Sequence, residues 1–238
     1  MGSIVAGALA AAAMGFAGLA GAARAEGAAP PVVVELFTSQ GCSACPPADR
    51  LLSDLAERDD VLALSLHVDY WDYIGWADSF ARPEHTARQR AYARAAGEGM
   101  IYTPQMVVGG THRVMGARAM SVLTAIEAHA AAPAPVSVRL ERRGDRLSVE
   151  AAASADAPER MVVQILRYRP ERTVRILRGE NAGHTFTYSN TVTAWERVAD
   201  WSGAEPLALT VEMPGADPAA VIVQAAGHGR IVGAAATR

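Results

Sequence analysis

Between residues 32 and 68, the hydrophobic positions alternate between continuous apolar runs and helical spacing. Val32–Phe37 and Val61–Val68 are short and dense in β-branched and aliphatic residues, which predicts two buried strands. One helix face lies between them, made of Ala48, Leu51, Leu52, Leu55 and Ala56. The chain is therefore expected to begin as a strand, a helix and a second strand.

The pattern continues with two further helices separated by a pair of short strands. Arg82–Ala96 has Pro83 in its first turn and a glycine directly after it, and Arg118–Ala130 has a mostly apolar side. Between these helices, a Gly-Gly pair separates Met106–Val108 from Thr111–Val114, which predicts a hairpin. The expected order is β-α-β-α-β-β-α over residues 30–130.

The pattern changes after the segment 130–135, which has the composition of a linker. Short strand-like runs follow, separated by turn signals such as Arg143-Gly144-Asp145. The runs are Val136–Leu140, Leu147–Ala152, Met161–Tyr168, Thr185–Val192, Leu207–Glu212, Val221–Ala226 and Ile231–Ala234. Their number and spacing predict a separate, sandwich-like all-β domain over residues 136–238.

Charge and composition narrow the classes of partner. The net charge is −3 and the basic residues form no block, so neither a nucleic acid nor an anionic membrane surface is expected as a partner. Half of the residues are hydrophobic, which is enough for a core without stabilising cross-links.

The N-terminal segment has the character of an export signal. Met1 to Ala23 carries no charged side chain, and Ala23-Arg24-Ala25 has the small-residue pattern of a cleavage site. We expect a signal peptide over residues 1–25, a periplasmic or secreted protein, and membrane contact through this signal alone. An uncleaved anchor is the alternative, although Ala and Gly supply little hydrophobicity for a membrane span.

Cys42 and Cys45, the only cysteines of the chain, lie at the first strand–helix junction. The N-terminus of a helix favours a thiolate through its free N–H groups and its dipole, so Cys42 is the candidate nucleophile. Cys45 is correctly spaced to attack a mixed disulfide formed at Cys42. Pro46 and Pro47 suit the first helical turn. The arrangement indicates a redox-active dithiol.

Two cysteines at this spacing have other possible uses. A structural zinc site needs four ligands, and no histidine has the spacing that would complete it. A purely structural disulfide would close too small a loop to stabilise much. Copper(I) bound by two thiolates remains an alternative. No organic cofactor is implied.

Three stretches carry a resemblance to a known family: VELFTSQGCSACPPAD, HVDYWDYIGW and YTPQMVV followed by glycine. They resemble the secreted thioredoxin-like family catalogued as domain of unknown function 1223, and the resemblance runs from Val32 to the C-terminus. It implies an α/β thioredoxin-like domain followed by the all-β domain. By this resemblance Cys42 is the exposed nucleophile, Cys45 its buried partner and Pro104 a cis-proline. Thr103 would then pair with a bound peptide strand.

Three polar residues of the first two strands and their ends are additional candidates for the site around the cysteines. Glu35 is the only charge in the first strand, and a buried carboxyl behind the cysteines would accept the proton of the resolving thiol. A solvated position at a sheet edge is its alternative. His67 and Asp69 end the second strand and are candidates to approach the same site, although a histidine satisfied within the core is more common.

The aromatic stretch Asp69–Trp76 is expected to pack over the strand ends, where ligand sites of open sheets lie. The alternative is a hydrophobic plug with two solvated aspartates. Together, these residues predict an exported thiol–disulfide oxidoreductase acting on a protein or small-molecule thiol. A copper(I)-binding protein and a non-catalytic scaffold remain the alternatives.

Overall fold

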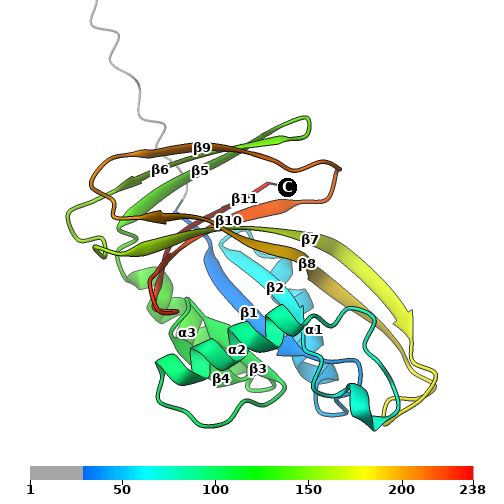
Figure 1. The fold of residues 1–238 in the computed structure, drawn as a ribbon. Coiled ribbons are helices and arrows are strands. Elements are labelled where there is room, and N and C mark those ends of the chain that lie inside the picture. Colours follow the sequence, from blue (N-terminus) through cyan, green and yellow to red (C-terminus); the bar gives the residue numbers. More distant parts are fainter. Residues whose placement is uncertain (1–28, 238) are drawn as a thin grey trace, which may run out of the picture.

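The computed structural model of the chain describes residues 29–237, so the predicted signal peptide at 1–25 lies outside the described residues (Figure 1). The elements of the first half follow the expected order. They are β1 (Val32–Thr38), α1 (Pro46–Ala56), β2 (Val61–His67), the 3₁₀ helix η1 (Asp72–Ile74), α2 (Pro83–Ala95), β3 (Gln105–Val108), β4 (His112–Met115) and α3 (Ala119–Ala131).

The second half consists of strands, each of which contains or overlaps one of the predicted runs. They are β5 (Val136–Arg143), β6 (Arg146–Ala153), β7 (Met161–Arg175), β8 (Thr185–Trp201), β9 (Leu207–Glu212), β10 (Ala219–Ala225) and β11 (Ile231–Ala236). Two of them, β7 and β8, are much longer than their apolar runs and form one extended hairpin (Figure 1).

The prediction of an α/β thioredoxin-like domain followed by a separate all-β domain is wrong. One mixed sheet of eight strands, in the order β11-β10-β7-β8-β2-β1-β3-β4, runs through both halves of the chain. The junction is the parallel pairing of β2 with β8, at Ser65 and Thr191. Only β5, β6 and β9 form a second sheet, and the fold of the described residues is mostly β with three α-helices.

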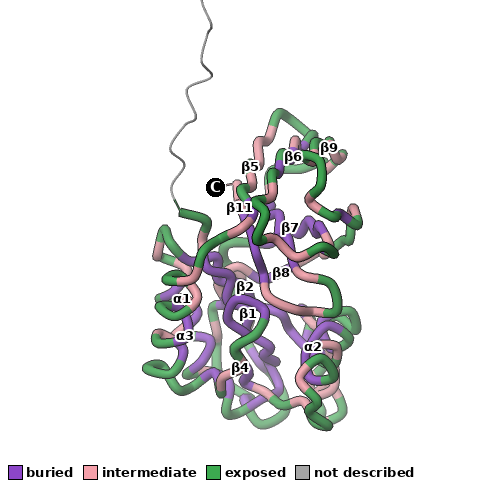
Figure 2. Tube along the Cα trace, turned by 90° about the vertical axis from the view of Figure 1, so that its left-hand side faces the viewer, coloured by how far each residue is buried: buried purple, intermediate pink, exposed green. Residues whose placement is uncertain are grey.

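Helices cover both faces of the first half of this sheet. Val34 and Leu36 of β1 pack with residues of α1 and α3, whereas Val33 and Phe37 pack on the opposite face with Tyr92 of α2. Figure 2 shows α1 and α3 on one side of β1 and β2, with α2 on the other side. Because both faces are covered, β1 and β2 are buried along their whole length.

The three-stranded sheet covers one face of the second half. Its apolar residues, including Leu147 and Val149 of β6, share a core with Val163 and Ile165 of β7. The opposite face of β7 carries Leu166 into the core that contains α2. The long hairpin is thus shared between two hydrophobic cores.

On the α2 face, a buried ion pair of the first half also contacts the second half. Arg88 of α2 is 8% exposed, and its guanidinium donates to both carboxylate oxygens of Glu35 in β1, at 2.5 and 3.1 Å. The same guanidinium donates to the amide oxygens of Gln164 in β7, at 3.1 Å, and Gln224 in β10, at 3.3 Å. It also stacks over the ring of Trp195 in β8, 4.0 Å from the centroid. One side chain therefore contacts four strands.

Removing this guanidinium is expected to destabilise the whole molecule. Arg88→Met leaves the fully buried Glu35 carboxylate without its cation, which costs about 3–5 kcal/mol when one partner of a buried pair is lost. Adding Glu35→Gln removes the unpaired charge and should restore part of the loss. Urea unfolding measures both values.

Arg58→Met is the matched control, because the Arg58–Asp60 pair is largely exposed and its loss should cost less than about 1 kcal/mol. An Arg88→Met protein that unfolds at the wild-type urea concentration would contradict the structural importance of this pair.

Candidate functional site

Cys42 and Cys45 form a disulfide at the junction of β1 and α1. The chain turns tightly there: the Cys42 N–H donates to the Ser39 carbonyl at 3.1 Å, and the Cys45 N–H to the Cys42 carbonyl at 3.2 Å. Cys45 is the N-cap residue of α1, and prolines fill the first helical positions, where no N–H is required. The pair thus begins the helix as the motif predicts.

Both cysteines are buried, including the one predicted to be exposed. Cys42 is 1% exposed and Cys45 is 0% exposed. Thiol–disulfide exchange requires a thiolate to reach one of the two sulfurs. In this conformation, the segments packed around the motif restrict that approach.

One of these segments is the connection between β7 and β8, residues 176–184 (Figure 1). The buried side-chain amide of Asn181 donates to the carbonyls of Gln40 and Cys42, at 2.9 and 3.1 Å. The Ser43 hydroxyl donates to the Glu180 carboxylate at 2.6 Å. We call residues 176–184 the hairpin cover, because they attach the tip of the second half to the disulfide loop.

The aromatic stretch forms a second wall of the site. Trp71 and Ile74 lie so close to Gly41 that a β-carbon there would meet them at 3.2–3.4 Å. The indole N–H of Trp71 donates to the Thr103 hydroxyl at 2.7 Å, and that of Trp76 to the Gln40 side chain at 2.8 Å. The stretch thus packs against the end of β1, as one of its two interpretations expected.

Pro104 and Thr103 lie beside this wall. The Thr103–Pro104 peptide bond is cis, as the resemblance implied. Pro104 is buried near the start of α1: a β-carbon on Gly116 would meet both Pro104 and Ala48 at 3.1–3.2 Å. Thr103 is half-buried, and its hydroxyl accepts the Trp71 hydrogen bond.

Glu35 is not brought to the cysteines. Its neighbours in β1, Val34 and Leu36, face α1, so Glu35 points to the opposite face of the sheet. There its carboxylate accepts from Arg88 and from the Tyr92 hydroxyl, the latter at 2.5 Å. The sheet separates this carboxylate from the helix that begins at Cys45.

A different buried carboxyl, that of Asp49, lies beneath the motif. Asp49 is on α1 one turn after Cys45, and its backbone N–H donates to the Cys45 carbonyl at 3.1 Å. Its carboxylate accepts from the Thr38 hydroxyl at 2.8 Å. Burial raises the pKa of Asp49 to about 7, although His67 and the Thr38 hydrogen bond favour its ionised form. Such a group can take up and release a proton near neutral pH.

His67 belongs to the same polar cluster. Thr38 and His67 are register neighbours in β1 and β2, and His67 Nδ1 lies 2.7 Å from Asp78 Oδ2. Burial opposes ionisation of Asp78, but His67 and the backbone N–H groups of Gln40 and Phe80 outweigh it and lower its pKa. Nε2 of His67 has no hydrogen-bond partner within residues 29–237.

Asp69 lies apart from this cluster and accepts from the Thr86 hydroxyl at 2.6 Å. The roles of Asp49, Asp78 and Asn181 were not expected from the sequence. The spacing could have indicated Asp49, since it follows Cys45 by four residues in a helix that begins at the motif. No sequence pattern indicates Asp78 or Asn181, because their contacts with the motif depend on chain folding.

In the described part of the chain, no three or more His, Cys, Asp or Glu side chains are grouped so that they could hold a metal ion. None of the helices between residues 29 and 237 has the length and hydropathy of a membrane span.

Comparisons with solved structures support this fold. A protein from Agrobacterium tumefaciens with a crystal structure shares 33% sequence identity with this chain. The two structures superpose with a TM-score of 0.76, covering 88% of this chain and 95% of that one. The HBP35 protein of Porphyromonas gingivalis is 15% identical with a TM-score of 0.62, covering 87% of this chain and 74% of that one, and shows likeness in fold alone.

The search of curated proteins found no match. A family model described as protein of unknown function, DUF1223, matches residues 33–224. The matched range includes the disulfide, the cis-proline, the hairpin cover and all of the eight-stranded sheet except β11, the first residue of β1 and the last residue of β10. The chain therefore belongs to the DUF1223 family.

Proposed function

We propose that this protein is a thiol–disulfide oxidoreductase that uses the Cys42–Cys45 pair. The observation that carries the proposal is the disulfide at the N-terminus of α1 with the Asp49 carboxyl, of pKa about 7, one helical turn behind it. An inert cross-link would not need a buried acid that titrates near neutral pH, because burial of such a group is itself costly.

The exchange begins from the reduced pair. The Cys42 thiolate attacks one sulfur of a substrate disulfide, and the first substrate thiolate leaves. The Cys45 thiol then transfers its proton to the Asp49 carboxylate and attacks the Cys42 sulfur. The second substrate thiolate leaves, so two electrons have passed from the pair to the substrate. The reverse sequence oxidises a substrate dithiol.

Access to Cys42 requires displacement of the hairpin cover. Three side-chain hydrogen bonds join the cover to the disulfide loop, two from Asn181 and one from Ser43 to Glu180. Ile176 of the cover is also fully buried, so opening exposes some apolar surface. Each hydrogen bond is worth about 0.5–1.5 kcal/mol net in a typical protein, so the polar part of the opening costs only a few kcal/mol. A protein or small-molecule thiol would then meet Cys42 between the cover and the Trp71–Thr103 wall.

Membership of the thioredoxin superfamily, in a form extended by the strands of the second half, is part of the same proposal. It is supported by the Cys-x-x-Cys motif before a helix and the cis-proline near that helix. Export to the periplasm or cell exterior is proposed from the segment 1–25, and two cysteines capable of exchange suit an oxidising compartment.

The burial of both sulfurs favours a second candidate function, a non-catalytic scaffold whose disulfide is never exchanged. The two functions differ in whether the disulfide equilibrates with an external thiol. Copper(I) binding by the reduced pair has no further observation in its favour.

Replacing the nucleophile tests the proposed function directly. Cys42→Ser should reduce the rate of insulin reduction or of glutathione exchange by at least about a hundredfold, since no attacking thiolate remains there. Cys45→Ser should instead accumulate a mixed disulfide at Cys42, detectable by mass spectrometry. A Cys42→Ser protein with wild-type exchange would refute the assignment.

Asp49 should control the resolving step. The carboxylate form accepts the proton, so resolution of a preformed mixed disulfide should accelerate as the pH rises through about 7. Asp49→Asn should slow this step about a hundredfold near pH 7 and remove the inflection at that pH, so that the rate simply follows the ionisation of the Cys45 thiol. Stopped-flow release of the second thiol measures it. Asp54→Asn, an exposed change on the same helix, should have no effect.

The pH dependence of the unfolding free energy independently tests the pKa of Asp49. The pKa rises from 3.8 in the unfolded chain to about 7 in the folded one, so the folded state binds the proton more tightly. The tighter proton binding adds to the free energy of unfolding. This added stability is fully present below about pH 4 and is lost as the pH rises to about 7. Asp49→Asn should flatten the decline in unfolding free energy across this range. An unchanged decline would contradict the assigned pKa.

Weakening the hairpin cover should expose the disulfide. Asn181→Ala removes two hydrogen bonds to the motif and should raise the rate of reduction by dithiothreitol about tenfold. Arg178→Ala, an exposed change in the same segment, is the control and should leave the rate unchanged. A disulfide that remains oxidised in excess dithiothreitol in all three proteins would support the scaffold.

A further inference from the structure

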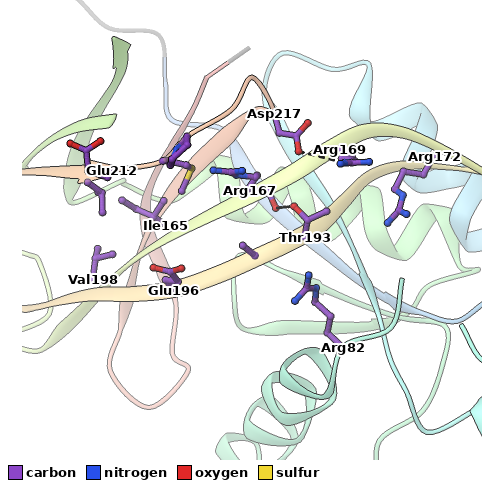
Figure 3. Close-up of a pocket in the computed structure, with 14 residues that line it drawn as sticks. Arg82, Ile165, Arg167, Arg169, Arg172, Thr193, Glu196, Val198, Glu212 and Asp217 are labelled. Carbon is purple, nitrogen blue, oxygen red and sulfur yellow. Dashed lines mark hydrogen bonds and ion pairs between the residues drawn. The ribbon is translucent and has the colours of Figure 1, made fainter. Parts of the chain in front are cut away.

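A cavity of about 560 Å³ lies away from the disulfide, where the β7–β8 hairpin passes the end of β9 and the start of α2 (Figure 3). Its volume is in the range typical of small-molecule sites. The end of β9 and the turn that follows it, Glu212–Pro214, form one wall, and the sheet face of β7 and β8 forms the floor.

Four arginines line one end of this cavity: Arg82, Arg167, Arg169 and Arg172. Figure 3 shows Arg167, Arg169 and Arg172 in sequence along β7, with Arg82 approaching from α2. They come from two parts of the chain that meet only in the folded protein. Three of the arginines lie within six residues of one another in the sequence, and Arg82 joins them only through folding.

Most of these arginines lack a carboxylate partner among the described residues. Arg169 has one loose ion pair, 3.4 Å from Asp217, while Arg82, Arg167 and Arg172 make no ion pair within residues 29–237. Glu212, another lining residue, is paired with Arg146 at 2.7 Å. Glu196 lines the opposite end of the cavity (Figure 3).

Arg172 shows that the cluster is held under mutual repulsion. Its guanidinium stacks on the ring of Phe80, 3.5 Å from the centroid, which fixes its direction. Burial lowers the pKa of Arg172 and the charges of Arg169 and Arg82 lower it further, while the carboxylate of Asp78 opposes them without restoring the usual value. An anion placed among the three would relieve this repulsion.

Apart from the arginines, the cavity is lined by apolar residues together with Thr193, Glu196, Glu212 and Asp217. Ile165 and Val198 lie on its floor, and Val211, Met213 and Pro214 on its wall. The wall is braced from behind, because the Arg142 guanidinium donates to the carbonyls of Met213, Gly215 and Asp217 at 3.0–3.1 Å. The apolar part is therefore pre-formed beside the basic end.

We propose that this cavity binds a small organic anion, with a carboxylate or phosphate group held by Arg82, Arg167 and Arg172 and an apolar portion lying over Ile165 and Val198. Guanidinium groups match the planar or tetrahedral oxygens of both head groups. The site contains neither cysteine and does not depend on thiol chemistry, so it stands apart from the proposed redox function.

Titration calorimetry with decanoate, decyl phosphate and neutral decanol tests this proposal on the full chain. We expect one molecule of an anionic probe to bind per protein, and decanol to bind at least about tenfold more weakly. The stronger of the two anions identifies the head group. Arg82→Gln and Arg172→Gln should each weaken anion binding about tenfold, by loss of one charge-assisted contact.

Arg175→Gln is the matched control, since it removes the same charge from the same strand outside the cavity and should leave the affinity unchanged. Arg82 is exposed and makes no side-chain ion pair, so its variant is expected to fold normally, and circular dichroism verifies this. Equal binding of decanol and decanoate, equal losses in Arg175→Gln and Arg82→Gln, or no binding of either anion at about 1 mM would overturn the proposal.

Discussion

The buried guanidinium of Arg88 is the interaction on which the fold depends. A charged side chain is costly to bury unless every donor is paired. The guanidinium donates to side-chain oxygens of Glu35, Gln164 and Gln224. It also stacks on the ring of Trp195. These partners belong to β1, β7, β10 and β8, so separating the two halves of the chain would strip the buried ion pair of the amide oxygens and the indole ring that the second half supplies. The pairing of β2 with β8 joins the same two halves within the sheet.

Because the sheet is continuous, residues of the second half contact the disulfide loop. The β7–β8 hairpin crosses the junction with β2, and the loop at its tip supplies Asn181 to the carbonyls of Gln40 and Cys42. The strands after residue 136 are therefore part of the site that contains the cysteines. If the pair exchanges, its rate is governed by a segment about 140 residues away in sequence, which allows access to be regulated without changing the cysteines themselves.

The two faces of the sheet also separate two kinds of buried charge. On the α2 face, Glu35 is fully paired and serves the architecture. On the α1 face, Asp49 has one hydroxyl donor and a pKa raised by burial to about 7, which suits a group that exchanges protons. His67 of the polar cluster packs against the ring of Phe80, and Arg172 of the arginine cavity stacks on the same ring.

The sequence by itself determined the helices and strands, their order, and the position of the cysteines at a strand–helix junction, because those features depend on local periodicity and on prolines near the helix start. Apart from the β3–β4 hairpin, it did not determine which strands pair. An apolar strand such as β1 has no polar face, so alternation could not show that Glu35 points away from α1. The pairing of β2 with β8, and with it the role of Asn181, was decided only in the tertiary structure. So was the role of Asp78, because buried polar groups must find partners from distant parts of the chain.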